Sequence, residues 1–437
     1  MDKSYIERIK EFGIVGAGGA GFPTHVKLNA QAEVVIVNGA ECEPLLRVDQ
    51  QLMTVFGSEL IEGLRIAINL TGAKKGVICL KGKYKSAIAK LGELIKNENS
   101  MELKIIADFY PAGDEQLLVY EVTKKVVPVM GLPLDVGAVV INVATAIQIG
   151  TGVPVTERVI TVTGDVEVPK TFTAPIGTSF LELIKECGGP ENLDDYRLNV
   201  GGPMMGYIEP DWNAPVTKVS GGIIILHKNH SLIVKKTRKT EMDLKLTKAI
   251  CCQCRYCTDM CPRYIIGKNT EPHKVMRGLA NEDPNALGSF SSVVSCCDCR
   301  LCSLYACPMD LDPGKLTNMV KQSLLRKGAK TEKIVPSEVD VLRDSKKVPT
   351  KRLIARLDLT DYNVDAPLES GIHVTRKVKI LLKQHIGVPA TPLIKTGDYV
   401  HKGTLIASCH DKLGANIHSS IDGSVVNITE HFIEIQV

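Results

Sequence analysis

Two cysteine runs with nearly the same spacing constrain this sequence more than any other feature. The first run reads Cys251-x2-Cys254-x2-Cys257-x3-Cys261-Pro262, and the second reads Cys296-x2-Cys299-x2-Cys302-x4-Cys307-Pro308. Three thiolates on one tight loop can bind three irons of a cubane, whereas the fourth iron needs a cysteine from a distant position. The runs therefore predict two [4Fe–4S] clusters in a ferredoxin-type domain, and an electron-transfer protein.

The spacing also predicts which cysteines share a cluster. In two-cluster ferredoxins the last cysteine of each run binds the other cluster. One cluster is thus expected on Cys251, Cys254, Cys257 and Cys307, and the other on Cys261, Cys296, Cys299 and Cys302. Their neighbours Cys252 and Cys297 fall out of register and are interpreted as packing residues. Paired zinc sites are the alternative, but zinc sites use four ligands and lack the third CxxC step and the terminal Cys-Pro.

Composition narrows the class of protein further. The chain has 437 residues, of which 44% are hydrophobic, a length that suggests about three or four domains. Lys and Arg outnumber Asp and Glu by only 53 to 49 without forming a basic stripe, which argues against a nucleic-acid partner. Metal-ligand spacing of the cysteines indicates a reducing, cytoplasmic compartment. No apolar run approaches the length of a membrane span, so we expect any membrane link to come through a partner.

The hydrophobic patterns divide the chain into four expected domains. Apolar runs at 34–39, 76–80 and 103–109 alternate with helix-like segments at 56–70 and 86–97, which is typical of a largely parallel α/β sheet. Short β-rich runs follow, with one helix ended by glycines, and the C-terminal region has strands separated by Gly and Asp turns. The predicted domains are an α/β domain (1–135), a small α+β domain (136–235), a helical two-cluster ferredoxin domain (240–325), preceded by a basic linker (231–250), and a β domain (362–437).

A glycine-rich loop marks the N-terminal domain. It reads GAGGAGFPT from Gly16 to Thr24 and contains GxGxxG, but the residues before it resemble a helix rather than the strand that a Rossmann fingerprint requires. Dense glycines let backbone N–H groups approach a phosphate or a flat ring, and Lys27 could neutralise charge there. FMN fits that chemistry, whereas a tight turn that merely tolerates glycine is the alternative.

Two other segments of the same domain end in polar groups. The strand VVIVNGAECEP ends in Asn38, Glu41, Cys42 and Glu43, and YPAGDEQ (110–116) is a second polar loop. Ligands of open α/β sheets bind outside the carboxyl ends of the strands. We therefore expect these groups to take part in the same binding site.

Together, GAGGAGFPTHVKL, NGAECEP, YPAGDEQ and VVINVATA resemble the flavin domain shared by the NADH-oxidising subunit of respiratory complex I and the C subunit of the Rnf complex. The resemblance implies that FMN lies among the positions that match that family. They are Gly16, Gly18, Gly19, Gly21, Lys27, Asn38, Glu41, Gly113, Asp114, Glu115 and Asn142, with Phe22 in place of the phenylalanine beside the nicotinamide.

The remaining domains sharpen the resemblance. Residues 140–230 are similar to the β-grasp SLBB domain that follows the flavin domain in this family. The C-terminal segment from QHIGVPATPLIKTGDYV to DGSVVNI resembles the barrel-sandwich hybrid domain, which Rnf C subunits carry at the N-terminus. With this domain last, the order of domains is similar to that of the PduS family, the cobalamin reductases of the propanediol-utilisation microcompartment.

This resemblance implies an NADH-dependent cob(III)alamin or cob(II)alamin reductase, an oxidoreductase that passes electrons from NADH through FMN and two [4Fe–4S] clusters to a corrinoid. Because the cofactors do the chemistry, no catalytic side chain is expected. The implied partners are NADH and a corrinoid or corrinoid-handling protein, with a microcompartment shell or another redox protein as further candidates. The expected location is the cytoplasm or the interior of a bacterial microcompartment. A non-catalytic electron-relay subunit of a larger redox complex, or a scaffold with structural clusters only, are the alternatives.

Two side chains of the C-terminal domain invite other interpretations. Barrel-sandwich domains can carry lipoate or biotin, and Lys412 lies where a modified lysine would be expected. Its flanking residues do not resemble a swinging-arm turn, which favours an ordinary turn lysine. His418, like His25 near the glycine loop, is interpreted as an ordinary histidine because no ligand motif surrounds it.

Overall fold

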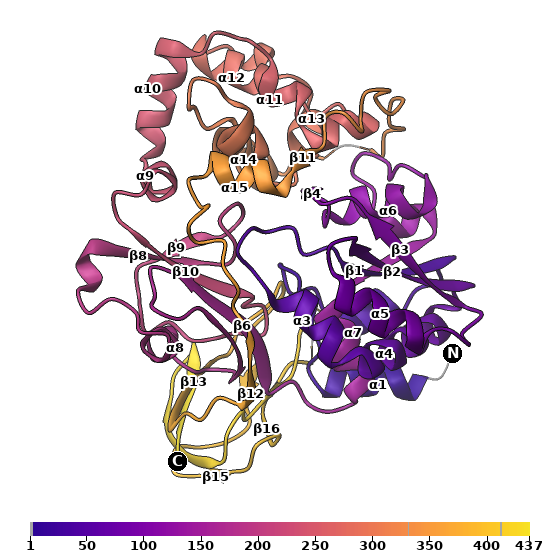
Figure 1. Ribbon diagram of the computed structural model, residues 1–437, viewed down its shortest axis with the longest axis vertical. Helices are drawn as coiled ribbons and strands as arrows, with labels where there is room; N and C mark the ends of the chain where they lie inside the picture. The colour runs from indigo at the N-terminus through magenta and orange to yellow at the C-terminus, as the bar shows by residue number, and fades with distance from the viewer. Residues whose placement is uncertain (1–2, 331, 411–412) are drawn as a thin grey trace.

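In the computed structural model, which describes residues 3–330, 332–410 and 413–437, the chain folds into the four kinds of domain that were predicted (Figure 1). The N-terminal α/β domain and the β-grasp domain lie side by side. The helical cysteine domain lies above them in this view, and the C-terminal β domain lies below. Lys412 lies outside the described residues.

The N-terminal domain is built on a four-stranded sheet in the order β3-β2-β1-β5, and all of its pairings are parallel. Because parallel strands are covered on both faces, their sequences are almost continuously apolar, as in the buried Val35, Ile36 and Val37 of β1. The strands are β1 (Val34–Gly39), β2 (Lys75–Lys81), β3 (Met101–Ile106) and β5 (Ala138–Asn142), and the helices are α1 (Lys3–Glu11), α2 (Thr24–Leu28), α3 (Val48–Val55), α4 (Gly57–Thr71), α5 (Lys85–Leu94), α6 (Glu115–Thr123) and α7 (Val143–Thr151). The sheet therefore extends past the boundary predicted at residue 135, because β5 pairs with β1.

The β-grasp domain contains a six-stranded sheet in the order β12-β7-β6-β10-β8-β9. Its helix α8 (Phe180–Glu186) buries Phe180, Leu183 and Ile184 against the sheet. The strands are β6 (Glu157–Gly164), β7 (Lys170–Pro175), β8 (Tyr196–Val200), β9 (Tyr207–Glu209), β10 (Gly222–His227) and β12 (Leu368–Ile372). The sequence places β12 in the last domain, but it pairs with β7 and so covers an edge that would otherwise be open.

The cysteine domain is helical. Its helices are α9 (Ser231–Thr237), α10 (Thr240–Ile250), α11 (Tyr256–Asp259), α12 (Pro272–Ala280), α13 (Phe290–Val294) and α14 (Pro313–Arg326). The prediction of a linker at 231–250 was wrong, since α9 and α10 occupy it. Leu232 and Ile233 are buried, and the Nζ of Lys235 donates to the carbonyl of Ser303 at 2.7 Å. These contacts attach the basic segment to the domain.

The C-terminal domain consists of two small sheets, ordered β13-β19-β18-β15 and β14-β16-β17. Its strands are β13 (Lys377–Leu381), β14 (Thr391–Pro392), β15 (Tyr399–Val400), β16 (Leu405–Ser408), β17 (Ile417–His418), β18 (Gly423–Ile428) and β19 (Phe432–Gln436), and β11 (Val348–Pro349) and α15 (Thr350–Arg356) precede it. β11 does not join either of these sheets but pairs with β4 (Phe109–Tyr110) of the N-terminal domain. Within the described residues, no helix has both the length and the apolar character needed to cross a bilayer.

Candidate functional site

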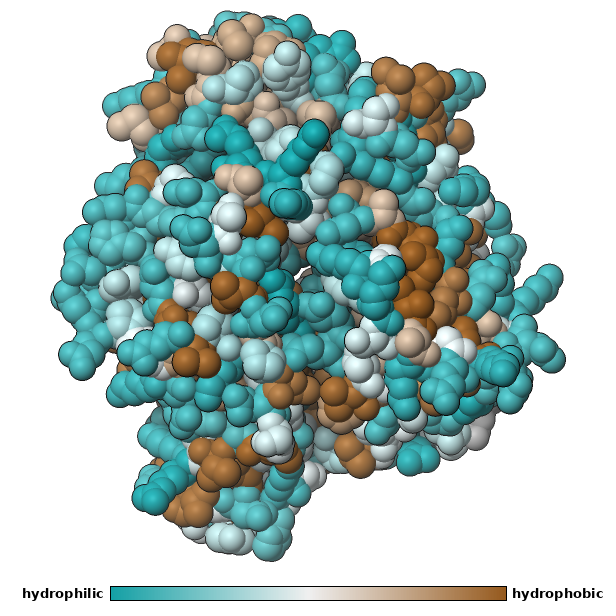
Figure 2. All heavy atoms as spheres, in the orientation of Figure 1, coloured by the Kyte–Doolittle hydropathy of each residue, from teal (hydrophilic) through white to brown (hydrophobic). Residues whose placement is uncertain are grey.

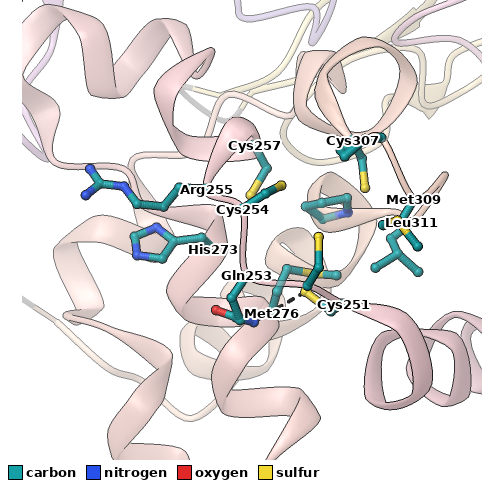
Figure 3. Close-up of a pocket in the computed structure, with 13 residues that line it drawn as sticks. Cys251, Gln253, Cys254, Arg255, Cys257, His273, Met276, Cys307, Met309 and Leu311 are labelled. Atoms are coloured by element: carbon teal, nitrogen blue, oxygen red, sulfur yellow. Dashed lines mark hydrogen bonds between the residues drawn. The ribbon is translucent and has the colours of Figure 1, made fainter.

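Four of the predicted cluster ligands line one cavity in the cysteine domain. They are Cys251, Cys254, Cys257 and Cys307, here called site I. In Figure 3 the sulfurs of Cys254, Cys257 and Cys307 face the same open space. Three come from the first run and one from the end of the second, which is the grouping that the spacing predicts. A cubane needs such an arrangement, because each of its four irons takes one thiolate.

The other four cysteines gather deeper in the same domain. They are Cys261, Cys296, Cys299 and Cys302, here called site II. Cys302 lies within electrostatic reach of Cys296 and Cys261, and Cys299 lies within reach of Cys302 and Cys261. Cys302 is also within reach of Cys257, so the two sites are neighbours.

Both cysteine loops use the same unusual backbone. Gln253 and Arg255 in the first loop have φ values of 56° and 70°, and Asp298 and Arg300 in the second have φ values of 55° and 60°. These residues occupy equivalent places between the cysteines. A left-handed conformation is unfavourable for residues with a Cβ and clusters at ligand sites. Its repetition indicates that both loops are shaped to turn their thiols toward one centre.

Burial sets the proton affinity of the thiols in the metal-free chain. It raises the pKa of Cys257 to about 12 and that of Cys296 to about 12, and it also raises the pKa of Cys302 well above its usual value. Only thiolates bind iron, so the metal must displace these protons as it binds. Assembly of both clusters is therefore expected to weaken as the pH falls.

Within the cysteine domain, the two cysteines outside the predicted ligand sets lie in different surroundings. Cys252 is exposed and lines the cavity of site I. Cys297 is half-buried and packs beside Tyr110, and the guanidinium of Arg263 is its neighbour. The side chain of Cys297 also bonds that of Cys299, a predicted ligand of site II, so it lies among the thiols of that site, whereas Cys252 lies at the surface.

The glycine loop has two kinds of glycine. A Cβ on Gly21, which has a φ of 70°, would lie 2.9 Å from the Cα of His385 in the C-terminal domain. A Cβ on Gly19 would meet nothing within 4 Å. Gly21 is therefore required by packing between domains, which the sequence interpretation missed. Gly19 faces open space where a ligand could approach.

Side chains from three segments meet near this loop. The Nζ of Lys27 lies 2.9 Å from Glu115 Oε1 and donates to the carbonyl of Val140 at 2.9 Å. The Nδ2 of Asn38 donates to the carbonyl of Gly113 at 2.9 Å. The structure thus brings together three of the segments that resemble the flavin family.

Asn142 joins this group from the end of β5. Its side chain caps α7 by accepting from the N–H of Ala144 at 2.8 Å, and it donates to Asp49 Oδ2 at 3.1 Å. A Cβ on Gly18 would lie 3.2 Å from the Cβ of Asn142. The end of β5 and the glycine loop are therefore in close contact, whereas the ring of Phe22 is partly exposed.

A half-buried pair of carboxyl groups, Glu41 and Asp49, lies beside this group. Glu41 Oε1 accepts from the backbone N–H of Val48 at 2.9 Å and of Asp49 at 3.2 Å. Burial, aided by the charge of Asp49, raises the pKa of Glu41 to about 8, and burial raises the pKa of Asp49 to about 6. At neutral pH this pair therefore retains a proton in the ligand-free chain.

Two buried oxygens near the glycine loop suit a polar ligand. Within the part of the chain that the structure describes, Glu41 Oε2 and the hydroxyl of Thr24 have no hydrogen-bond partner. Buried polar atoms without a partner are uncommon and usually indicate a missing ligand or water. Together with the open space at Gly19, these atoms fit a flavin, which carries a polar ring and a phosphate.

The family resemblance implies that Asp114 faces the flavin, but its carboxylate has other partners. Its Oδ1 caps α6 by accepting from the N–H groups of Gln116 and Leu117 at 3.1 and 3.0 Å. Its Oδ2 lies 2.7 Å from Nη2 of Arg263 in the cysteine domain. Both oxygens therefore have protein partners.

Arg158, which the sequence interpretation missed, supports the glycine loop from the β-grasp domain. It is buried in β6, and it donates to the carbonyls of Ala17 at 2.9 Å and Ser220 at 2.6 Å. The hydroxyl of Thr145 accepts from the N–H of Ala17 at 2.9 Å. Thr145 lies in the recognised VVINVATA segment and could have been selected from it, but no local signal distinguishes Arg158.

Comparison with protein families assigns each domain. Residues 9–151 match the Nuo51 FMN-binding domain, and residues 159–208 match the SLBB domain. Residues 250–312 match the 4Fe-4S dicluster domain, and residues 363–436 match the RnfC barrel-sandwich hybrid domain. The predictions of FMN and of two [4Fe–4S] clusters as cofactors are confirmed at this level.

Curated relatives match over most of the chain. The cobalamin reductases PduS of Citrobacter freundii and of Salmonella typhimurium are each 41% identical over 434 residues, which cover 98% of this chain and 95% of theirs. The Na(+)-translocating ferredoxin:NAD(+) oxidoreductase complex of Acetobacterium woodii has a C subunit that is 36% identical over 275 residues, which cover 61% of this chain and 59% of that protein.

Proposed function

Because the chain belongs to the PduS family of cobalamin reductases, we propose that it is an NADH-dependent oxidoreductase that reduces a corrinoid through FMN and two [4Fe–4S] clusters. The balanced reaction oxidises one NADH to NAD⁺ and H⁺ and reduces two cobalt(III) centres to cobalt(II). FMN would accept a hydride and release single electrons, and the clusters would carry those electrons one at a time.

The main support is that one chain contains a candidate flavin site and two sets of four thiols, joined by the loop 110–116. On the flavin side, the loop carries Gly113, which accepts from Asn38, and Glu115, which pairs with Lys27. On the other side, Asp114 pairs with Arg263 near site II. In this proposal the residues on the flavin side hold and orient the flavin, and the thiols of sites I and II bind the clusters.

Lys27 has a specific part in the proposal. It follows the glycine loop in α2 and places a positive charge between Glu115 and the end of β5. A cation there would favour an anionic ligand and would hold the second loop against the sheet. Glu41 and Thr24 would supply hydrogen-bonding oxygens to the same ligand.

The test uses purified chain reconstituted anaerobically with iron, sulfide and FMN. We expect bound FMN, two clusters, and an NADH-dependent change of the corrinoid spectrum from cobalt(III) to cobalt(II). Lys27→Met should lower the FMN content and leave the iron content unchanged. Lys75→Met, which removes an exposed lysine paired with Glu102 on the same domain, is the matched control and should change neither.

Three results would contradict the proposal or its assignment of Lys27. A reconstituted chain that carries FMN and iron but does not reduce corrinoid with NADH would exclude reductase activity. Absence of NADH oxidation, together with copurification with a membrane complex, would favour the electron-relay subunit instead. Equal loss of FMN in the Lys27 and Lys75 variants would show that the flavin does not depend on Lys27.

A further inference from the structure

The loop 110–116 contacts one arm of site II through Tyr110. The tyrosine side chain is 1% exposed, and its hydroxyl donates to the carbonyl of Cys299 at 2.7 Å. Its ring packs beside Cys42, at the end of β1, and beside Cys297. One buried ring therefore spans from the strand end on the flavin side to the cysteine loop of site II.

The same loop contacts the other arm of site II through Arg263. This arginine follows Cys261 by two residues and pairs with Asp114 at 2.7 Å, with both side chains about one-tenth exposed (10% and 9%). It also donates to the side chain of Gln116, which accepts from Lys268 as well. The two arms of site II, which the sequence separates by more than thirty residues, are thus both held by one loop of the flavin domain.

Site I has a different position. The residues that line its cavity all lie between Cys251 and Pro313, within the cysteine domain. Cys252, Cys254 and Arg255 on its rim are exposed, as are the side chains of Tyr256 (56%) and Met309 (39%). Tan spheres, the colour of moderately apolar residues, lie over this end of the molecule in Figure 2. Site I therefore lies next to the surface, on a part of the domain that the flavin loop does not hold.

We propose that site II holds the entry cluster, which takes electrons from the flavin, and that site I holds the exit cluster, which delivers them to the acceptor. Tyr110 and Arg263 are positioning residues, because they fix the distance between the flavin loop and site II without binding iron. This inference rests on the proposed function. The reason for the order is that electron tunnelling slows steeply with distance and that, among the eight predicted ligands, the exposed one, Cys254, belongs to site I. Each electron that leaves the flavin would reduce the cluster of site II, which would in turn reduce the cluster of site I.

The order can be tested by removing one cluster at a time. Cys296→Ala should remove the cluster of site II. In this variant NADH should reduce the FMN but not the remaining cluster, which dithionite should still reduce. Cys251→Ala should remove the cluster of site I, and NADH should then still reduce the cluster of site II. Rapid freeze-quench electron paramagnetic resonance reports each cluster separately. Reduction of the site I cluster by NADH in Cys296→Ala would overturn the proposal.

Either cysteine variant could lose both clusters. A milder variant, which should keep both clusters, then tests the proposal. Tyr110→Phe removes one hydroxyl and keeps the ring. We expect the cluster of site II to be reduced more slowly and its midpoint potential to fall, because the Cys299 carbonyl loses its donor while iron and FMN contents stay the same. Tyr362→Phe is the matched control, since that hydroxyl bonds Asp165 in the β-grasp domain. Unchanged kinetics and potentials in Tyr110→Phe, or changes confined to site I, would contradict the assignment.

If the proposed NADH-dependent function is wrong, that failure can be distinguished from a failure of the cluster order. If NADH does not reduce the FMN of the wild-type chain, the bound FMN is reduced by light instead, and the reduced FMN then supplies the electrons. The order in which the two clusters are then reduced still tests the assignment of entry and exit, whatever the natural donor is.

Discussion

Sites I and II each offer four thiols, but the residues around the two sites differ in burial and in their ion pairs. Arg255 beside site I forms a loose pair with Asp259 at 3.5 Å, with side chains 47% and 40% exposed. Arg263 beside site II forms a tight pair with Asp114 at 2.7 Å and is buried against another domain. Two cysteine runs of nearly the same spacing therefore lie in different surroundings, because different segments pack around them, and this difference would let two similar clusters play different parts.

The most severe expected effect concerns the ligands themselves. Cys307→Ala should remove the cluster of site I, although Cys307 belongs to the second run, and should lower the iron content by roughly half. Iron and acid-labile sulfide analysis with electron paramagnetic resonance checks this result. Loss confined to the cluster of site II would show that each run binds its own cluster.

A smaller effect is expected from the two arginines. Removing one partner of a buried ion pair lowers the free energy of unfolding by about 3–5 kcal/mol. Arg263→Gln should therefore move the urea midpoint of the holoprotein to a lower concentration. Arg255→Gln should cost less than about 0.5 kcal/mol, because exposed ion pairs contribute little. Anaerobic urea unfolding of both variants measures the difference. Similar shifts in the two variants would mean that the contact between the domains contributes little to stability.

The smallest expected effect is a difference in reactivity without any substitution. Limited ferricyanide should destroy the cluster of site I before that of site II, since Cys254 of site I is exposed, whereas the cysteines of site II are buried or half-buried. The two resonance signals, followed against added oxidant, report the order of loss. Simultaneous loss would indicate that solvent reaches both sites equally.

Local sequence was sufficient for several parts of this protein. The cysteine spacing predicted two groups of four thiols, and the structure places those of site I around one cavity. The apolar runs predicted the parallel sheet, since strands buried on both faces need continuous apolar residues. The helix before the glycine loop was also evident, as α1 confirms.

Other features depended on contacts between distant segments. Arg263 and Asp114 are 149 residues apart, and Tyr110 and Cys299 are 189 residues apart. Gly21 needs its glycine because His385 of the last domain packs on it, and the glycine pattern alone does not distinguish this cause from ligand binding. Such pairs leave no periodic signal in a single sequence.

The sequence by itself determined which cysteines can surround a cluster and which segments resemble a flavin domain, because spacing and strand patterns act over a few residues. Only the tertiary structure decided that site II lies against the flavin loop and site I near the surface. The physical reason is that burial, ion pairing and distance between sites arise where separate domains pack together, and none of these is encoded within either cysteine run.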